Sequence, residues 1–200
     1  MATPGMITLI MAYYLAIQHT ALSAVPNDTA LKLTRVMGTP NINMGEKNQL
    51  TIELDFPVGT TNNVVIEIIS SPEETVLAFA KVVNSSVGSN LMLDQGMAAI
   101  LKNTTVNPGI EYVSAVKVRY NTHAIINLGT VFNTGSDTNL SASQISITYE
   151  VVMISDAGLG TGTQYWTGVG MEYNNGQYIW ISQISYTLNK TIKGVPGNPD

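Results

Sequence analysis

Cysteine is absent from all 200 residues of the sequence. Disulfide bonds, on which small extracellular domains often depend, therefore cannot stabilise this chain. Its stability has to come from the size of its core, from association between chains or from another kind of covalent link. The length is sufficient for one domain with a substantial core.

Charged side chains are also scarce. They make up 12% of the chain, about half of the usual fraction, and the net charge of −5 is spread thinly along the sequence. The sequence has no basic patch, which argues against a nucleic-acid partner. Threonine, serine and asparagine supply most of the remaining polar surface, and this composition suits β-strands with neutral outer faces.

Histidine occurs only at His19 and His123. A catalytic triad or a histidine-bound metal would have to be built on His123 alone, and we expect that residue to lie at the surface or at a strand end. Glu53 and Asp55 fall on a polar strand face rather than in a paired acid–base arrangement. The glycine-rich run Gly158–Gly162 leads into a strand and not into a helix, so it does not predict a phosphate site. The sequence predicts neither an enzyme nor a cofactor.

The beginning of the chain differs from the rest. Residues Met6–Ile17 form an apolar run without a charged side chain, and the small residues Ala21, Ser23 and Ala24 follow it. This pattern predicts a secretory signal peptide over residues 1–24, because the run is too short for a stable membrane span. The lack of a basic residue before the run departs from the usual pattern, and a buried strand or helix is the alternative.

Three consecutive strands are predicted between Ser143 and Leu188. Apolar and polar residues alternate from Ile145 to Met153, from Tyr165 to Tyr173 and from Ile184 to Leu188. A period of two places one face of each strand on a core and the other in water. Between the last two runs lies Asn174–Gln177, with the sequence Asn-Asn-Gly-Gln, and Asn-Gly tolerates the positive φ angles of a tight hairpin turn.

The rest of the chain also contains runs that are typical of strands. Further strands are predicted at Leu31–Val36, Leu50–Phe56, Val64–Ile69, Tyr112–Tyr120 and Ala124–Val131, with a turn at Asn84–Asn90 and a loop at Asn103–Gly109. Val76–Val83 fits a strand or a helix, and Leu91–Leu101 is the run after the leader that best fits a helix. Together these patterns predict an all-β fold, an immunoglobulin-like antiparallel β-sandwich of about eight or nine strands.

Three segments resemble a known family. Ile126–Met153, Met44–Ile68 and Val82–Leu91 are similar to the second half, the opening and the middle of DUF11, a conserved repeat domain of bacterial surface proteins. The resemblance covers roughly residues 35–188 and implies an immunoglobulin-like sandwich on an extracellular protein that acts as a stalk, an adhesin or matrix. Family members occur as tandem arrays, whereas this chain has one copy.

Five sequons for N-linked glycosylation are present, at Asn27, Asn84, Asn103, Asn139 and Asn189. Each falls in or beside a predicted loop or strand end, where a glycan can be accommodated. Together with the predicted signal peptide, they favour an extracellular or cell-surface glycoprotein if the source is eukaryotic.

The polar loop Asn133–Asn139 contains one carboxylate, Asp137, among several oxygen-bearing side chains. Calcium prefers six to eight oxygen ligands and usually several carboxylates. We therefore interpret this loop as a turn stabilised by Asn and Asp side chains, and we predict no metal site.

Aromatic residues gather late in the chain. Trp166 and Trp180 are candidate surface anchors for a sugar ring or a neighbouring subunit, although a half-buried position in the sandwich is the simpler interpretation. Trp166 and Tyr173 have opposite parity on one predicted strand, so one of them is expected to face outward. These residues support an alternative function, a carbohydrate- or protein-binding adhesive module that acts as a monomer.

Some cysteine-free bacterial surface sandwiches carry a Lys–Asn isopeptide bond between their first and last strands. Lys32 and Asn189 lie at the corresponding ends of this sequence. Such a bond would exclude a glycan on Asn189, because both modifications use the same side-chain nitrogen.

The order of segments suits assembly of the chain with copies of itself. The sequence divides into the signal peptide, an N-terminal strand and hinge at 25–45, the sandwich at 46–189 and a polar tail at 190–200. The segment from Val25 to Val36 could complete an exposed sheet edge of a neighbouring copy, giving a head-to-tail filament. The alternative is that Leu31–Val36 pairs within its own sandwich.

Overall fold

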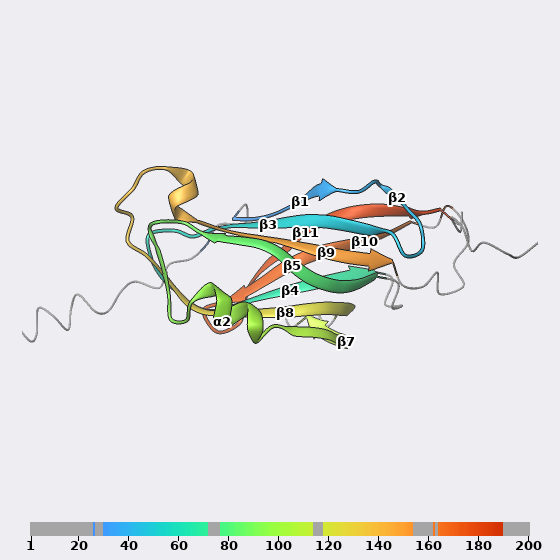
Figure 1. Ribbon diagram of the computed structural model, residues 1–200. Coiled ribbons are helices and arrows are strands. Elements are labelled where there is room, and N and C mark those ends of the chain that lie inside the picture. The colour runs from blue at the N-terminus through green and yellow to red at the C-terminus, as the bar shows by residue number, and fades with distance from the viewer. Residues whose placement is uncertain are drawn as a thin grey trace, which may run out of the picture.

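Two facing β-sheets form the fold in the computed structural model (Figure 1), which describes residues 26, 30–71, 77–113, 118–153, 162 and 164–189. The strands are β1 (Leu31–Met37), β2 (Asn41–Ile42), β3 (Lys47–Asp55), β4 (Gly59–Ser71), β5 (Leu77–Val87), β6 (Leu91–Leu93), β7 (Thr105–Val113), β8 (Val118–Asn133), β9 (Gln144–Met153), β10 (Gln164–Tyr173) and β11 (Gln177–Leu188). One short helix, α2 (Met97–Lys102), and one 3-10 turn, η1 (Leu140–Ser143), complete the described elements.

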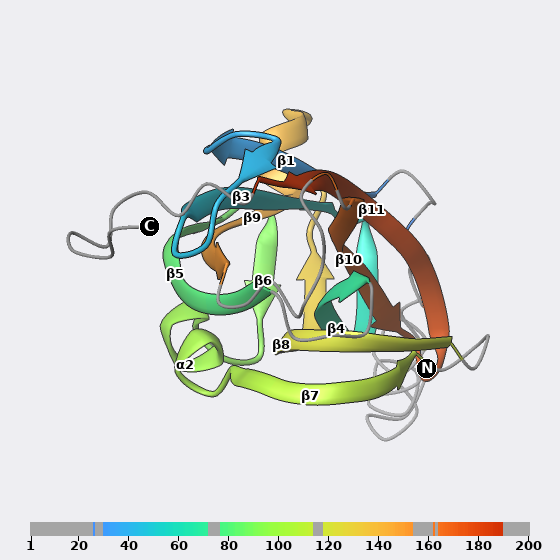
Figure 2. The ribbon, with the colours of Figure 1, turned by 90° about the vertical axis from the view of Figure 1, so that its right-hand side faces the viewer.

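The two sheets have the order β1-β3-β9-β5 and β2-β11-β10-β4-β8-β6, and β7 also pairs with β8. All these pairings are antiparallel except that of β2 with β11. The N-terminal part of the sandwich thus contributes one strand to each sheet, β1 to the first and β2 to the second. Figure 2 views the molecule from one end and shows the layer that contains β1, β3 and β9 above the layer that contains β8. The predicted immunoglobulin-like sandwich is confirmed.

Alternation along the strands builds the core between the sheets. Strand β3 is representative, because Leu50, Ile52 and Leu54 are fully buried whereas the residues between them are half-buried on the outer face. Tyr149 of β9 is also fully buried, and its ring stacks on that of Phe79 in β5 with 5.8 Å between centroids. The period of two in the sequence therefore specifies which face of each strand is packed.

The predicted hairpin between β10 and β11 is confirmed. Tyr173 and Gln177 are register partners, and the three residues between them have φ angles of 46° at Asn174, 62° at Asn175 and 106° at Gly176. Asparagine and glycine adopt this left-handed region at the lowest cost, which explains their presence in the turn.

Several predicted boundaries are wrong. The run Leu91–Leu101 is divided between β6 and a helix of six residues, and the segment 112–120 is divided between β7 and β8. Strand β7 covers most of the predicted loop Asn103–Gly109, and β5 continues into the predicted turn Asn84–Asn90 as far as Val87. Val76–Val83 contributes a strand rather than a helix.

The sandwich is elongated, and the described chain enters and leaves it at opposite ends (Figure 1). We call the end where β1 begins the N-terminal pole; there the amide of Asp55 donates to the carbonyl of Ala30 over 2.8 Å. We call the other end the C-terminal pole; there the amide of Asn189 donates to the carbonyl of Ile42 over 3.0 Å. No helix in the described part of the chain is long and apolar enough to cross a membrane.

Candidate functional site

Strand β1, the predicted donor strand, lies at the edge of the four-stranded sheet and pairs with β3 of its own chain. Only Leu31 and Leu33 of the strand are buried. The amide of Leu33 donates to Ser182 Oγ over 3.0 Å, and the guanidinium of Arg35 donates to the carbonyl of Ser185 over 3.0 Å. Both acceptors belong to β11, so β1 also holds the two sheets together.

Arg35 makes a second contact with β11. Its guanidinium carbon lies 4.7 Å from the centroid of the Tyr186 ring, within cation–π range. Burial raises the pKa of Tyr186, and the hydrogen bond and positive charge of Arg35 partly offset that increase. Arg35 is therefore the main polar anchor of β1.

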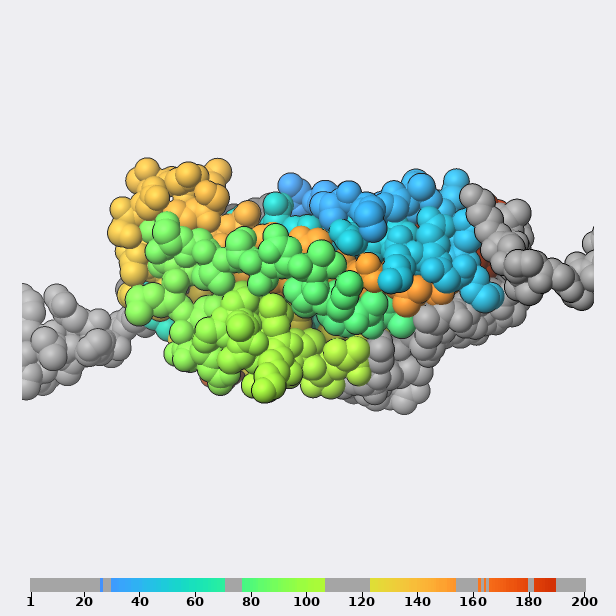
Figure 3. Space-filling view, viewed as in Figure 1, coloured from blue at the N-terminus to red at the C-terminus, as the bar shows by residue number. Residues whose placement is uncertain are grey.

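Exposed apolar side chains occur at both poles. Val58, Met92, Phe132 and Leu140 lie toward the N-terminal pole, and Leu140 on η1 is 87% exposed. The segment that carries η1 projects from the molecule at this end (Figure 3). Val36, Met37 and Met44 are the corresponding exposed residues toward the C-terminal pole. Each end of the sandwich thus offers apolar surface for contact with another molecule.

The loop Asn133–Asn139 is held by its own side chains, as predicted. Asn133 Oδ1 accepts from the Gly135 amide over 2.9 Å, and Asp137 Oδ1 accepts from the Asn139 amide over 2.9 Å. The buried side chain of Asn90 completes the arrangement, because its Nδ2 donates to the Asp137 carbonyl over 2.7 Å. The oxygens of the loop are therefore used within the protein.

A pocket of about 430 Å³ opens beside β8. Strand β6 pairs with Val131–Asn133 of β8 and β7 pairs with Val118–Ile125, so β8 has no partner strand on that edge between these two stretches. The chain connecting β6 to β7, which includes α2, stands away from β8 there. The polar lining of the pocket comes from Asp94, Gln95, Asn103, Thr105 and Asn127. Its apolar surface comes from Ile100, Ile125 and Leu128.

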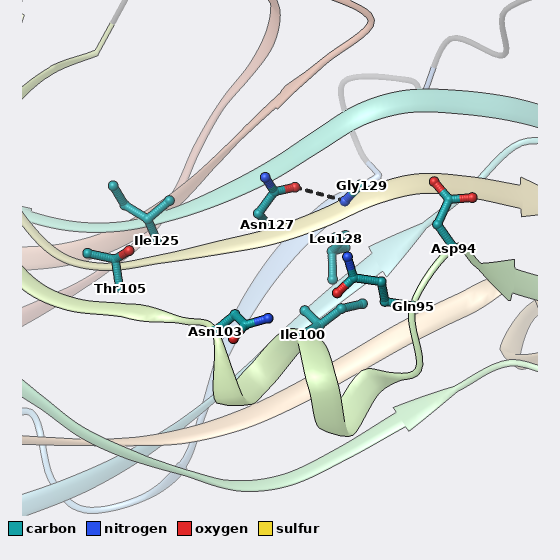
Figure 4. A pocket seen from close by; sticks show the side chains of 9 residues that line it. All are labelled: Asp94, Gln95, Ile100, Asn103, Thr105, Ile125, Asn127, Leu128 and Gly129. Atoms are coloured by element: carbon teal, nitrogen blue, oxygen red, sulfur yellow. Dashed lines mark hydrogen bonds between the residues drawn. The ribbon is translucent and has the colours of Figure 1, made fainter.

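Hydrogen bonds fix two of the polar side chains in this pocket. Asn127 Oδ1 accepts from the Gly129 amide over 2.9 Å, and Asp94 Oδ2 accepts from the Thr130 amide over 3.2 Å. Figure 4 shows these residues with Gln95 and Asn103, whose side chains extend toward one another. Gly129 has a φ of +70°, which favours glycine at the edge of the pocket.

Four of the five sequon asparagines lie within the described residues. Asn84 is on the edge strand β5, Asn103 follows α2, Asn139 precedes η1 and Asn189 follows β11; all four are exposed. Asn27 lies outside the described residues. A glycan could be attached at each of the four without displacing a buried side chain.

The two candidate anchors, Trp166 and Trp180, lie on the neighbouring strands β10 and β11. Trp166 is half-buried on β10, on the opposite face from the buried Tyr173, so the parity argument is confirmed. Trp180 lies on β11, and its side chain is outside the described residues. Tyr178 of β11 crosses Gly170 of β10 and donates to Glu67 Oε2 over 2.9 Å.

His123 is not at the surface, contrary to expectation. Its side chain is 1% exposed, its Nε2 has no hydrogen-bond partner among the described residues, and burial lowers its pKa to about 4. Consecutive His123 and Ala124 are both buried because the pairing of β8 with β4 shifts register here, and such an irregularity breaks strict alternation. The imidazole is therefore neutral at pH 7.

The proposed Lys32–Asn189 isopeptide is incompatible with the observed positions. Lys32 is exposed and pairs with Glu53 at 3.3 Å. Its neighbour Leu33 contacts Ser182, seven residues before Asn189 on β11, which corresponds to roughly 24 Å along an extended strand. The two residues lie toward opposite poles, because the first and last strands of this fold meet near the middle of β11.

Glu53 and Asp55, which the sequence places on a polar strand face, have separate partners. Glu53 pairs with Lys32, and Asp55 Oδ1 accepts from Gln144 Nε2 over 3.0 Å. Among the described residues, no three His, Cys, Asp or Glu side chains gather in a way that could hold a metal ion.

Comparison with known proteins does not assign this chain to a family. No protein-family model matches the sequence, and no curated protein matches it. The similarity to DUF11 therefore stays a resemblance, although the sandwich fold that it implied is correct.

Solved structures with a similar fold have little sequence in common with this chain. The N-terminal domain of the Streptococcus gordonii adhesin Sgo0707 is 11% identical, with a TM-score of 0.44, over 80% of this chain and 33% of that one. Domains D2 and D3 of the major pilin SpaD from Corynebacterium diphtheriae are 14% identical, with a TM-score of 0.38, over 78% and 49%. A cohesin module from a Clostridium perfringens family 33 glycoside hydrolase is 8% identical, with a TM-score of 0.36, over 81% and 98%. The chain thus spans about a third of the adhesin structure and about half of the pilin structure, and these matches carry no argument about function.

Proposed function

We propose that the chain is a secreted structural subunit that assembles head to tail into an extracellular filament, with N-linked glycans along its sides. The observation that carries this proposal is the placement of Ala30 and Asn189 at opposite poles of the sandwich. A unit with this geometry repeats along an axis when one pole contacts the next copy's other pole. Such a heterologous contact extends indefinitely unless its rotation closes a ring.

Strand β1 provides the link between copies. It is an edge strand of seven residues with two buried side chains, and the hinge that follows contains Gly38 at a φ of +102° and Gly45 at +75°. If β1 leaves its own β3 and pairs with β3 of a neighbour, the same contacts form in a different molecule. Exchange of an identical element has a low thermodynamic cost for this reason. The exposed apolar side chains at the poles would then be covered in the filament.

The positions of the sequons support linear rather than lateral association. Asn84 lies on β5, which is the other edge of the four-stranded sheet, and Asn103 precedes β7 at an edge of the second sheet. Exposed strand edges are templates for unwanted pairing. Glycans at these two positions would cover both edges, while β1 stays available.

A disulfide lock tests the strand exchange. Thr34 and Thr51 are register partners on β1 and β3, and directly opposed residues lie within disulfide reach. Because the natural chain has no cysteine, Thr34→Cys/Thr51→Cys introduces one defined pair. We expect the reduced variant to sediment as a concentration-dependent polymer. The variant oxidised at high dilution, while it is a monomer, should remain a monomer when it is concentrated.

The reduced form of the same variant is the matched control, since both redox states lack the hydrogen bond between the Thr51 and Thr148 hydroxyls. Equal assembly of the two redox states would refute strand exchange but not polymerisation. A monomer in every sample, the natural chain included, would refute the filament.

Mass mapping of the sequon peptides tests the proposed glycosylation. In protein secreted from a eukaryotic cell, we expect glycans at the exposed sequons Asn84, Asn103, Asn139 and Asn189, and also at Asn27. Peptide mass mapping before and after enzymatic deglycosylation measures the occupancy of each site. Unmodified peptides at all of these positions would contradict the proposal, whereas partial occupancy would identify the sites that matter.

A second function is a monomeric binding module for a carbohydrate or protein ligand. The half-buried Trp166 on the outer face of β10 and the polar pocket beside β8 favour it. It differs from the first proposal in requiring a saturable ligand and no self-association.

A further inference from the structure

We propose that the pocket between α2 and β8 binds the ring of a neutral sugar. The chemistry of the pocket lining supports this proposal, which does not depend on assembly into a filament. Its volume of about 430 Å³ falls within the usual range for small-molecule sites and is sufficient for one pyranose ring with its hydroxyl groups.

The polar groups of the pocket match vicinal hydroxyls. A sugar hydroxyl is both a donor and an acceptor, so it needs partners of both kinds. The carboxylate of Asp94 accepts only, whereas the carboxamides of Gln95, Asn103 and Asn127 each offer an acceptor and two donors. Ile100 and Ile125 provide apolar surface for the C–H groups of the ring.

Two of these groups are already oriented. One oxygen of Asp94 accepts from the Thr130 amide and Asn127 Oδ1 accepts from the Gly129 amide, as Figure 4 shows for the second. The other oxygen of Asp94 and the Nδ2 of Asn127 have no hydrogen-bond partner within the described part of the chain and can bind a ligand. Fixed polar groups lose less conformational entropy on binding than mobile ones do.

The same lining disfavours other ligand classes. Among the described residues, no lysine, arginine or histidine lines the pocket, so a phosphate or carboxylate would face Asp94 without a compensating charge. Calcium would find a single carboxylate, whereas it usually takes several. A neutral polyhydroxylated ring satisfies the donors and acceptors without adding charge.

Asn103 connects the pocket to glycosylation. It is exposed, it lines the pocket and it belongs to a sequon. A glycan on Asn103 would exclude a free ligand, so the proposed binding applies to copies in which this sequon is unoccupied. The binding experiment therefore uses the full chain produced without N-glycosylation.

Saturation-transfer NMR with the methyl glycosides of glucose, galactose, mannose and N-acetylglucosamine tests the proposal, with sialic acid as a charged probe. Calcium has no proton to observe, so its binding is measured by isothermal titration calorimetry. We expect saturable binding of at least one neutral glycoside, with a Kd on the order of 1 mM, and no binding of either charged probe. Asp94→Asn should weaken the binding roughly tenfold, because a charge-assisted hydrogen bond is lost.

The substitution is chosen so that folding is preserved, since asparagine keeps an acceptor for the Thr130 amide. Asp55→Asn is the matched control, because Asp55 is another exposed carboxylate outside the pocket lining, and it should leave the affinity unchanged. Absence of saturable binding by every neutral glycoside, or binding that Asp94→Asn does not weaken, would overturn the proposal. Stronger binding of sialic acid or calcium would also overturn it.

Discussion

Replacing Tyr149 with alanine is expected to lower the free energy of unfolding by about 4 kcal/mol, because it removes a fully buried aromatic ring from the centre of the core. Tyr149 lies on β9, which pairs with both β3 and β5, and its ring stacks on Phe79. The sandwich cannot close such a cavity without shifting two other strands. Chemical denaturation of the full chain at pH 7 measures the change.

Tyr149→Phe is the matched control, and we expect it not to lower the free energy of unfolding. The Tyr149 hydroxyl is buried without a hydrogen-bond partner among the described residues, and burial together with the nearby Tyr186 raises its pKa well above the usual value. Removing the hydroxyl should leave stability unchanged or raise it by about 1 kcal/mol. A loss of more than about 1 kcal/mol in Tyr149→Phe would show that the hydroxyl has a partner that stabilises the fold.

Acid should destabilise the protein through His123, by up to about 3 kcal/mol. Burial lowers the pKa of His123 from 6.5 to about 4 in the folded state, whereas the unfolded chain keeps an ordinary imidazole. Between these two values the unfolded state binds the proton more readily. Stability is therefore unaffected by this group above pH 6.5, falls as the pH decreases toward 4 and changes no further below that.

The variant His123→Phe isolates this contribution, because it keeps a buried ring and removes the titrating group. Urea unfolding at pH 7.5, 6.5, 5.5 and 4.5 should show a steeper loss of stability in the natural chain than in the variant. The carboxylates titrate in both proteins and cancel in the comparison. Parallel pH profiles for the two proteins would contradict a buried, neutral His123.

Strands that are buried on one face were predictable from the sequence. Alternation from Ile145 to Met153 and from Leu50 to Phe56 corresponds to β9 and β3, the two central strands of their sheet. Burial of every second residue is the physical cause of that pattern, so it identifies a strand wherever one face packs and the other is solvated. The turn at Asn174–Gly176 was predictable because few other residues adopt positive φ.

Edge strands were harder to predict, since they are solvated on more than one side. The second half of β5 contains Asn84, Ser85 and Ser86, which are typical of turns, yet its position at the sheet edge leaves them exposed or half-buried. Strand β7 contains Pro108, which sequence rules assign to a loop. A proline is tolerated at an edge because a strand there needs hydrogen bonds on one side only.

The pocket had no signature in the sequence. It exists because β6 and β7 pair with different stretches of β8 and leave a gap between them, and pairing of this kind is a tertiary property. Asn103 is visible in the sequence as part of a sequon, but its proximity to Asp94 and Asn127 depends on that gap. The burial of His123 has no signature in the sequence for a related reason, because it follows from a shift of register between β4 and β8.

Electron microscopy of the natural, full chain over a wide range of concentrations tests the central claim most directly. We expect unbranched filaments whose axial repeat matches the length of one sandwich, since the described chain enters at one pole and leaves at the other. Filament length should increase with concentration, as expected for a heterologous contact that does not close. Single particles of one domain's size at every concentration would contradict it.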